Sequence, residues 1–287
     1  YLNRMLEAAA KVSKLKGDNI VNKEEIKKIV KELQGIASKI KLIHIFTMYG
    51  GVLEIFSVPF LTVESAYYGV INELDDKKES ILKLYQLLGE IEAYISIGGF
   101  KEAKEEYISK PVFKNEITIN IVNGVHPLLE EPVANTIHLN KKGMVLTGSN
   151  MSGKSTFLRM VGVNIVLAQV FDLVLAEKYE GSIFNIVTSI SPKDDVNAGK
   201  SYYMAEVDRI IEALKKDVPV FCVIDEIFRG TNPVERVAAS AAILEYINKY
   251  NAITFVATHD RELTDMLKDK YEFRYFTENV DKKNGMT

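Results

Sequence analysis

Residues 143–170 read "GMVLTGSNMSGKSTFLRMVGVNIVLAQV", in which a short apolar run precedes a glycine-containing turn and a long apolar segment. The run predicts a β-strand, and the segment after the turn predicts a helix. The turn fits the pattern GxxxxGK[ST], and a strand, turn and helix in this order are the context in which that pattern binds phosphate. The stretch therefore predicts an α/β fold with a phosphate-binding loop at the start of a helix.

Four residues of this loop have predicted roles. Gly148 and Gly153 let the backbone curl so that its N–H groups face a phosphate, and the helix dipole adds positive potential there. Lys154 supplies a point charge for the β- and γ-phosphates, and Ser155 offers a hydroxyl to Mg²⁺. We therefore expect a site for a nucleoside triphosphate and Mg²⁺.

Two other apolar runs end in polar residues. Residues 218–226, "VPVFCVIDE", predict a strand that ends at Asp225 and Glu226, and ligands bind at the carboxyl edge of such sheets. We expect Asp225 to hold Mg²⁺ through water and Glu226 to orient or deprotonate the attacking water. The run "AITFVATHD" ends in His259, which we interpret as a polar sensor of the γ-phosphate at the same edge.

Two segments have a structural interpretation as well as a functional one. Ser201 precedes a predicted helix, where it caps the helix or binds an anion such as a γ-phosphate on a neighbouring subunit. Asn232 is predicted to cap a helix that has Pro233 at its first position and Glu235 in a capping box. Capping does not explain "RGT" at residues 229–231, which we expect to face the nucleotide or a partner subunit.

The spacing of apolar residues along the sequence changes near residue 110. Up to about residue 107, apolar residues recur at three- and four-residue spacing, which predicts helices. Beyond it, strand-like runs alternate with helical stretches, and apolar residues are continuous along the runs, as in a parallel sheet. The runs are "ITINIV", "GMVLTG", "SIFNIVTSI", "VPVFCVID", "AITFVATH" and "YEFRYF". We predict an all-helical domain at residues 1–110 and an α/β domain with a mostly parallel sheet at residues 111–287.

Composition limits the class of protein. With 287 residues, 47% of them hydrophobic, the chain buries a sizeable core, and its single cysteine, Cys222, cannot form an internal disulfide. No run approaches the roughly 20 apolar residues that cross a bilayer. A net charge of −3 and a pI near 5.9 argue against a protein coated in basic surface for nucleic acid. We expect a fragment of a longer cytoplasmic protein, because the chain starts at Tyr1 without a signal pattern.

Four stretches carry a family resemblance: "TGSNMSGKSTFLRMVGVNIVLAQ", "DDVNAGKSYYMAEVDRI", "VIDEIFRGTNPVERVAASAAILE" and "FVATHDRELTDML". Together they resemble the ATPase domain of the MutS family of DNA mismatch-repair ATPases. The resemblance covers about residues 85–287 and implies an ABC-class P-loop fold that forms a homodimer with two composite ATP sites. Each site would take its phosphate loop from one subunit and the helix-capping serine from the other.

The resemblance assigns a role to each motif residue. It makes Glu226, Lys154 and His259 catalytic, and it places Mg²⁺ on Ser155 and Asp225. It assigns ATP binding to Gly148, Ser149, Asn150, Met151, Ser152, Gly153, Lys154, Ser155, Thr156, Ser201 acting in trans, Thr231 and Asn232.

The sequence departs from the family pattern in several places. Ser149 and Ser152 stand where mismatch-repair members have Pro and Gly, Val125 replaces an Arg, and "EEPVAN" lacks the aromatic residue that stacks on adenine. No mismatch-reading domain fits within the helical part, which is more similar to short MutS-like proteins. The chain also stops short of the closing strand and helix of such ATPases, which predicts weakened dimerisation.

Two functions follow as hypotheses. The first is a Mg²⁺-dependent ATPase module of a MutS-like protein, which dimerises with ATP and, in the full-length protein, contacts DNA or a repair partner. The second is a nucleotide-gated ABC-type scaffold, in a membrane-associated assembly or elsewhere, without direct DNA recognition, and the acidic pI favours it slightly.

Overall fold

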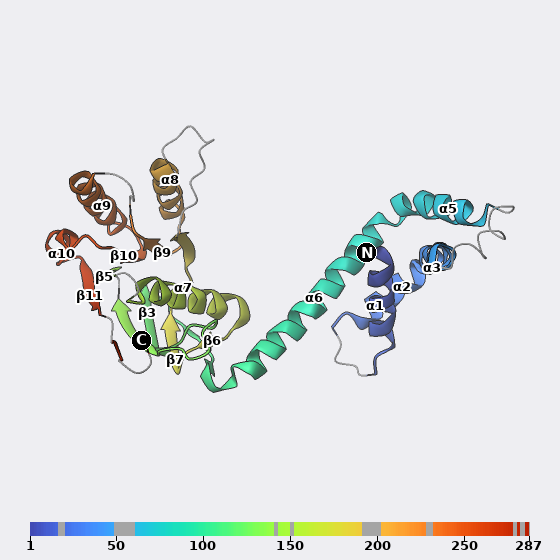
Figure 1. Cartoon of the computed structure of the whole chain (residues 1–287), viewed down its shortest axis with the longest axis horizontal. Helices are drawn as coiled ribbons and strands as arrows, with labels where there is room; N and C mark the ends of the chain where they lie inside the picture. Colours follow the sequence, from blue (N-terminus) through green and yellow to red (C-terminus); the bar gives the residue numbers. More distant parts are fainter. Residues whose placement is uncertain are drawn as a thin grey trace. The chain divides into compact units, whose positions relative to one another are not determined.

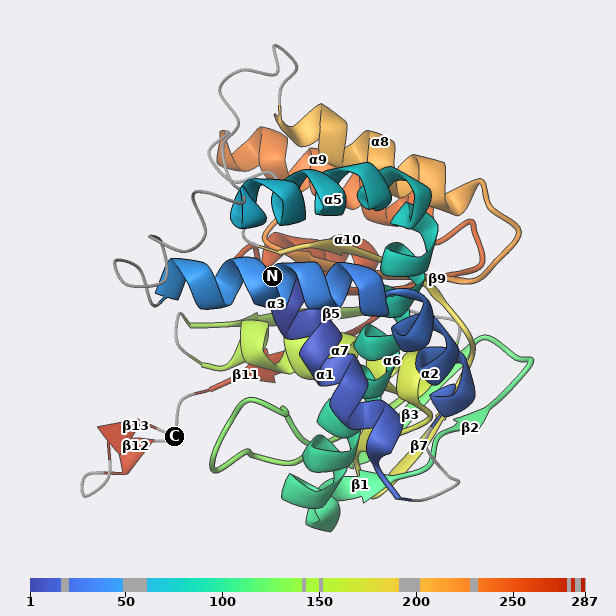
Figure 2. The same cartoon turned by 90° about the vertical axis from the view of Figure 1, so that its right-hand side faces the viewer.

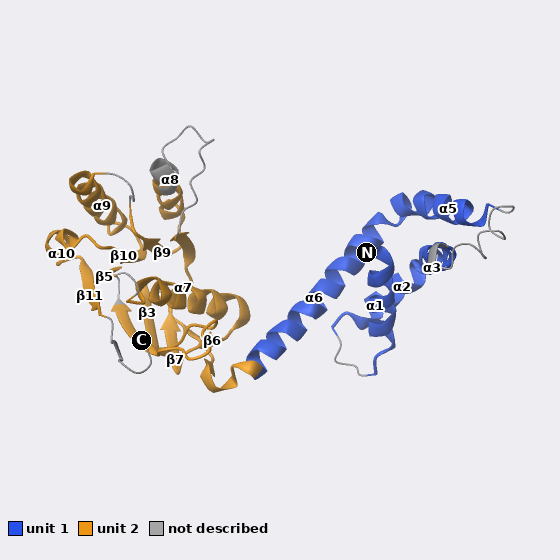
Figure 3. Ribbon diagram, viewed as in Figure 1, with its two compact units in different colours: residues 1–102 blue, residues 103–287 orange. Residues whose placement is uncertain are grey.

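The computed structural model describes residues 1–16, 21–48, 61–140, 143–149, 152–190, 202–227, 232–277, 280–281 and 285–286. The chain forms two compact units, Tyr1–Glu102 and Ala103–Thr287 (Figure 3). None of the helices in these described ranges is both long and apolar enough to cross a membrane.

The first unit consists of helices. They are α1 (Leu2–Lys14), α2 (Lys23–Glu32), α3 (Gln34–Met48), α5 (Thr62–Asp76) and α6 (Lys78–Ala103). Helices α3 and α5 run side by side (Figure 2), and Lys39 of α3 forms an ion pair with Glu73 of α5. Leu33 follows the last residue of α2 as its C-cap and separates it from α3, and its side chain is fully buried in the core of the unit.

In its described residues, the second unit contains a five-stranded sheet, a four-stranded sheet and two pairs of short strands, β1-β6 and β12-β13. Its secondary structure is a 3₁₀ turn (Glu105–Tyr107), β1 (Ile108–Ser109), β2 (Val112–Phe113), β3 (Thr118–Gly124), β4 (Asn135–Asn140), β5 (Gly143–Gly148), α7 (Lys154–Phe171), β6 (Val174–Leu175), β7 (Lys178–Gly181), β8 (Asn185–Ser189), α8 (Tyr202–Leu214), β9 (Val220–Asp225), α9 (Pro233–Ile247), β10 (Ala252–Ala257), α10 (Glu262–Leu267), β11 (Tyr271–Phe276), β12 (Val280–Asp281) and β13 (Gly285–Met286).

The larger sheet confirms the predicted parallel α/β layer. Its five strands lie in the order β11-β5-β10-β9-β8, and every neighbouring pair is parallel. Five of the six predicted runs form it. The sixth, "ITINIV", instead lies in a second sheet of order β2-β7-β3-β4, where β3 is antiparallel to both neighbours. The prediction of one sheet was wrong at this point, because the apolar pattern of a strand does not specify its partner.

Alternation along the parallel strands fills two cores. On β9, Phe221 and Val223 pack with residues of α7 and of the second sheet, whereas Cys222 and Ile224 pack with α8, α9 and α10. Helix α7 accordingly covers one face of the parallel sheet, and α8 and α9 cover the other (Figure 1). Burial on both faces explains why these strands read as continuous apolar runs.

A buried amide anchors α7 to the loops around it. The fully buried Asn164 side chain donates to the carbonyls of Val125 and Met160 at 3.1 and 2.9 Å, and it accepts from the Leu175 N–H at 2.7 Å. Buried polar groups are costly without such partners. These bonds fix the helix whose first turn carries Lys154.

Candidate functional site

The predicted site residues that the structure describes lie at or just beyond the carboxyl edge of the parallel sheet. Asn150, Met151, Ser201 and Thr231 lie outside the described residues. The strand register aligns Leu146 of β5 with Ala257 of β10, and Ala257 with Asp225 of β9. The loop after β5, the acidic pair and His259 therefore all follow strands that end at the same edge.

Glycine is required at the end of β5 for two reasons. Gly148 has φ +146°, which only glycine adopts without strain, and an added Cβ would lie 2.2 Å from the carbonyl oxygen of Phe276 on β11. Gly153 has φ +88° with open space around it. Gly148 thus allows the backbone of β11 to approach closely, whereas Gly153 is needed only for the turn of the chain into α7.

The ammonium group of Lys154 is folded back onto its own loop. The residue is 7% exposed, and its Nζ donates to the Gly148 carbonyl at 2.9 Å and also to the Ser149 carbonyl. The Ser152 hydroxyl donates to the same Ser149 carbonyl at 2.9 Å. A largely buried ammonium needs such acceptors, and the oxygens of an anionic ligand would compete for it as stronger, charged acceptors.

The first turn of α7 begins directly at this lysine. The earliest helical bond runs from the Phe157 N–H to the Gly153 carbonyl at 2.9 Å. The N–H groups of Lys154, Ser155 and Thr156 therefore precede the helical hydrogen-bond ladder, and the helix dipole adds positive potential around them. Gly153, Lys154 and these N–H groups form a site with the chemistry of an anion-binding turn.

The acidic pair lies where β9 ends. Asp225 is the last residue of the strand and is 7% exposed. Glu226 has φ +62°, an uncommon conformation for a residue other than glycine, and its N–H donates to the Ala257 carbonyl at 2.9 Å. The chain thus leaves the extended conformation between the two carboxylates, while Glu226 stays tied to the neighbouring strand.

His259 lies against Glu226. The His259 Nε2 is 3.1 Å from the Glu226 Oε1, close enough for the imidazole N–H to donate to the carboxylate, and these side chains are 40% and 24% exposed. The preceding residue, Thr258, donates its N–H to the Leu146 carbonyl of β5 at 2.9 Å. The chain at His259 is therefore tied to the phosphate-loop strand through Thr258 and to Glu226 through the imidazole.

A further ion pair beside His259 was not predicted from the sequence. Arg236, in the first turn of α9, donates from Nε to Asp260 Oδ2 at 2.8 Å and from Nη2 to Asp260 Oδ1 at 2.5 Å. The hydrogen bonds from Arg236 hold the pKa of Asp260 below its ordinary value. Only the opposite charges of these residues hinted at the pair, since 24 residues separate them.

Asn232 is occupied by the helix that follows it. Its side-chain oxygen accepts from the Val234 N–H at 3.0 Å, and Pro233 is the first residue of α9, which confirms the predicted cap. A ligand role for Asn232 stays a prediction.

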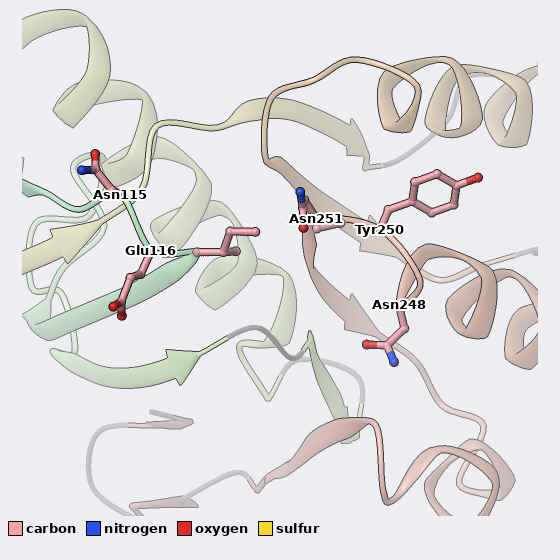
Figure 4. Close-up of a pocket in the computed structure, with 7 residues that line it drawn as sticks. Asn115, Glu116, Asn248, Tyr250 and Asn251 are labelled. Carbon is pink, nitrogen blue, oxygen red and sulfur yellow. The ribbon is translucent and has the colours of Figure 1, made fainter.

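A cavity at the opposite end of the sheet is separate from this edge. It measures about 540 Å³ and includes Asn115, Glu116, Asn248 and Asn251 in its lining. Figure 4 shows these residues on the connection into β3 and on the connection from α9 to β10. The cavity also reaches Ala252, the first residue of β10, whereas His259 follows the last, so the two lie at different edges of the sheet.

Comparison with known proteins gives concordant matches. A family model described as MutS domain V matches residues 144–287. The DNA mismatch repair protein MutS of Lysinibacillus sphaericus is 34% identical over 235 residues, which cover 76% of this chain and 27% of that protein. The protein of that name from Listeria monocytogenes is 33% identical over 240 residues, which cover 78% of this chain and 27% of that protein.

A shorter match has a higher identity. The DNA mismatch repair protein MutS of Streptococcus mutans is 37% identical over 175 residues, which cover 57% of this chain and 21% of that protein. In these comparisons the chain spans about a quarter of the length of the relatives.

Proposed function

Because the chain belongs to the MutS family, we propose that residues 111–287 form an ABC-class P-loop ATPase domain that binds ATP with Mg²⁺ and hydrolyses it. Residues 1–110 would form a helical, lever-like domain. The observation that carries the proposal is the shared sheet edge at which the Lys154 turn, Asp225, Glu226 and His259 meet. We propose a cytoplasmic setting, which the buried free thiol of Cys222 fits.

The residues at this edge fit a triphosphate and a divalent cation. The glycines at 148 and 153 leave the backbone free of side chains, and Lys154 and the α7 N-terminus offer positive charge. Residues 148–156 would contact the phosphates, while Ser155 and Asp225 supply hydroxyl and carboxylate oxygens of the kind that Mg²⁺ prefers. When bound, Mg²⁺ offsets charge that develops on the phosphate oxygens.

Glu226 and His259 would carry the hydrolytic step. A carboxylate held in place by a hydrogen bond can orient a water molecule and take its proton. Glu226 is a half-buried carboxylate at this edge, and it is held by the His259 imidazole. His259, fixed beside it, would sense the γ-phosphate through its imidazole. Lys154 would leave its carbonyl acceptors for the phosphates.

A homodimer would complete the site. We propose that Ser201 of one subunit contacts the γ-phosphate held by the other, and that Thr231 and Asn232 line the same interface. In the full-length protein, ATP-driven dimerisation would regulate contact with DNA. A scaffold without direct DNA recognition is the second candidate, favoured by the net charge of −3.

Substitution of the proposed base tests hydrolysis. We expect Glu226→Gln to bind ATP with wild-type affinity and to lower turnover by roughly 10²- to 10⁴-fold, the usual contribution of a general base. Glu212→Gln, the same chemical change on an exposed part of α8, is the matched control and should retain full turnover. Unchanged turnover in Glu226→Gln would remove that residue from the catalytic role.

Sedimentation of the full-length protein tests the dimer and DNA. With ATP and Mg²⁺ we expect dimers, and DNA binding should weaken steeply with salt because phosphate contacts release counterions. ATP-dependent dimers that ignore mismatched, branched and single-stranded DNA would favour the scaffold. A monomer indifferent to ATP and to DNA would reject both candidates.

A further inference from the structure

The Arg236–Asp260 ion pair joins the first turn of α9 to the loop that carries His259. Both guanidinium contacts are short, at 2.8 and 2.5 Å, and the two side chains are only 26% and 11% exposed. A two-point contact of this kind fixes orientation as well as distance. We refer to this pair as the brace.

The brace acts on His259 through the residue next to it. The Asp260 N–H donates to the Thr258 hydroxyl at 3.1 Å, so residues 258–260 form a closed turn. Thr258 is anchored to β5 through its backbone, and Asp260 is anchored to α9 through its carboxylate. The exposed His259 thus lies between two fixed neighbours, which restricts the directions its ring can take.

The other end of the brace is also fixed. Arg236 follows the Asn232 cap by four residues, and its N–H donates to the Asn232 carbonyl at 2.8 Å. Further along α9, Leu244 and Ile247 are buried in the core against the sheet. Arg236 therefore extends from a rigid helix, and its loss would free the Asp260 side chain.

Charge gives the brace a second effect. The Asp260 hydrogen bonds raise the pKa of Arg236, and Glu226 and Glu262 act on it in the same direction. The guanidinium engages both oxygens of Asp260, so the neighbouring imidazole would have to share that carboxylate with Arg236. Without Arg236, Asp260 would compete with Glu226 for the His259 N–H.

We propose that Arg236 and Asp260 are positioning residues that hold His259 against Glu226 and thereby set the rate of ATP hydrolysis. This inference rests on the proposed ATPase function. Neither residue needs to touch the nucleotide, so its removal should change kcat and leave the affinity for ATP almost unaltered. The brace also links α9, which starts beside the proposed subunit interface, to the hydrolytic pair.

Steady-state hydrolysis of ATP by the full chain tests the brace. We expect Arg236→Met to lower kcat by about 10- to 100-fold, as misplacement of a catalytic group does, with KM for ATP changed by less than about twofold. Arg236→Lys keeps the positive charge but cannot make the two-point contact of a guanidinium, so its kcat should lie between those of the wild type and Arg236→Met. The matched control is Lys270→Met, which removes a different ion pair of α9, to Glu245, and should keep the wild-type kcat.

A double variant separates positioning from a general loss of stability. Once His259→Ala has removed the imidazole, adding Arg236→Met should lower kcat by no more than about twofold, because the two residues act through one contact. Fully multiplied effects would show that Arg236 acts elsewhere and would overturn the inference.

The imidazole resonances of His259 give a readout that does not depend on activity. With ¹³C- and ¹⁵N-labelled histidine, Arg236→Met and Arg236→Lys should shift the His259 ring signals, while Lys270→Met should leave them in place. If the wild-type chain hydrolyses ATP and both Arg236 variants keep its kcat and its His259 ring signals, the positioning role of the brace is overturned and the proposed ATPase function stands. A wild-type chain without ATP turnover would overturn both proposals.

Discussion

Alanine substitution of three glycines around the phosphate-loop turn gives a graded test of the site. At Gly148, φ +146° is strained for alanine by about 1–3 kcal/mol. The new Cβ would also lie 2.2 Å from the Phe276 carbonyl oxygen, a backbone atom that cannot rotate away. Moving the end of β11 would cost about one further hydrogen bond, or about 1 kcal/mol. The free energy of unfolding should therefore fall by about 2–4 kcal/mol.

The two other glycines serve as matched controls. Gly153 has φ +88° and no atom within 4 Å of an added Cβ, so Gly153→Ala should cost only the left-handed strain of about 1–2 kcal/mol. Gly162 lies within α7, where the Cβ would make an ordinary contact of 3.9 Å with Val223. Gly162→Ala should stabilise the unit by up to about 1 kcal/mol through helix propensity.

Native-state hydrogen exchange of the β10 amides reports on the second unit alone. These amides lie at the centre of the parallel sheet, so their exchange follows opening of that unit. Stability should fall in the order Gly162→Ala, wild type, Gly153→Ala, Gly148→Ala. Equal stability of Gly148→Ala and Gly162→Ala would refute the reasoning, because neither the positive φ nor the contact with the β11 backbone would then carry a cost.

Two further predictions concern titratable groups. Arg236 lowers the pKa of Asp260, so the pair stabilises the fold above the ordinary aspartate pKa, and this contribution is lost as pH falls through the lowered pKa. Asp260→Asn removes this ionisation, so its stability should fall less steeply than that of the wild type below about pH 4. An acid titration followed by circular dichroism measures the difference. Burial raises the pKa of the Cys222 thiol to about 12, so a thiol reagent at pH 8 should label it only after denaturant is added, and rapid labelling of the native protein would contradict the buried position.

Much of the second unit was predictable because its signals are local. The strand, glycine turn and helix around Lys154 are contiguous, and the apolar runs that end at Asp225 and before His259 identify strands without knowledge of their partners. The parallel sheet and membership of the MutS family are confirmed. The nucleotide, Mg²⁺ and catalytic roles of these residues stay predictions.

By itself, the sequence determined the order of the elements, the two-faced apolar strands and the polar residues at their carboxyl ends, since each depends on neighbours along the chain. Only the tertiary structure decided that "ITINIV" pairs in a second sheet, that His259 contacts Glu226 and that Arg236 grips Asp260. The residues of each ion pair are at least 24 positions apart in the sequence, and the paired strands come from separate segments of the chain. Periodicity cannot encode such partners, because each partner is selected by how the strands and helices pack in three dimensions.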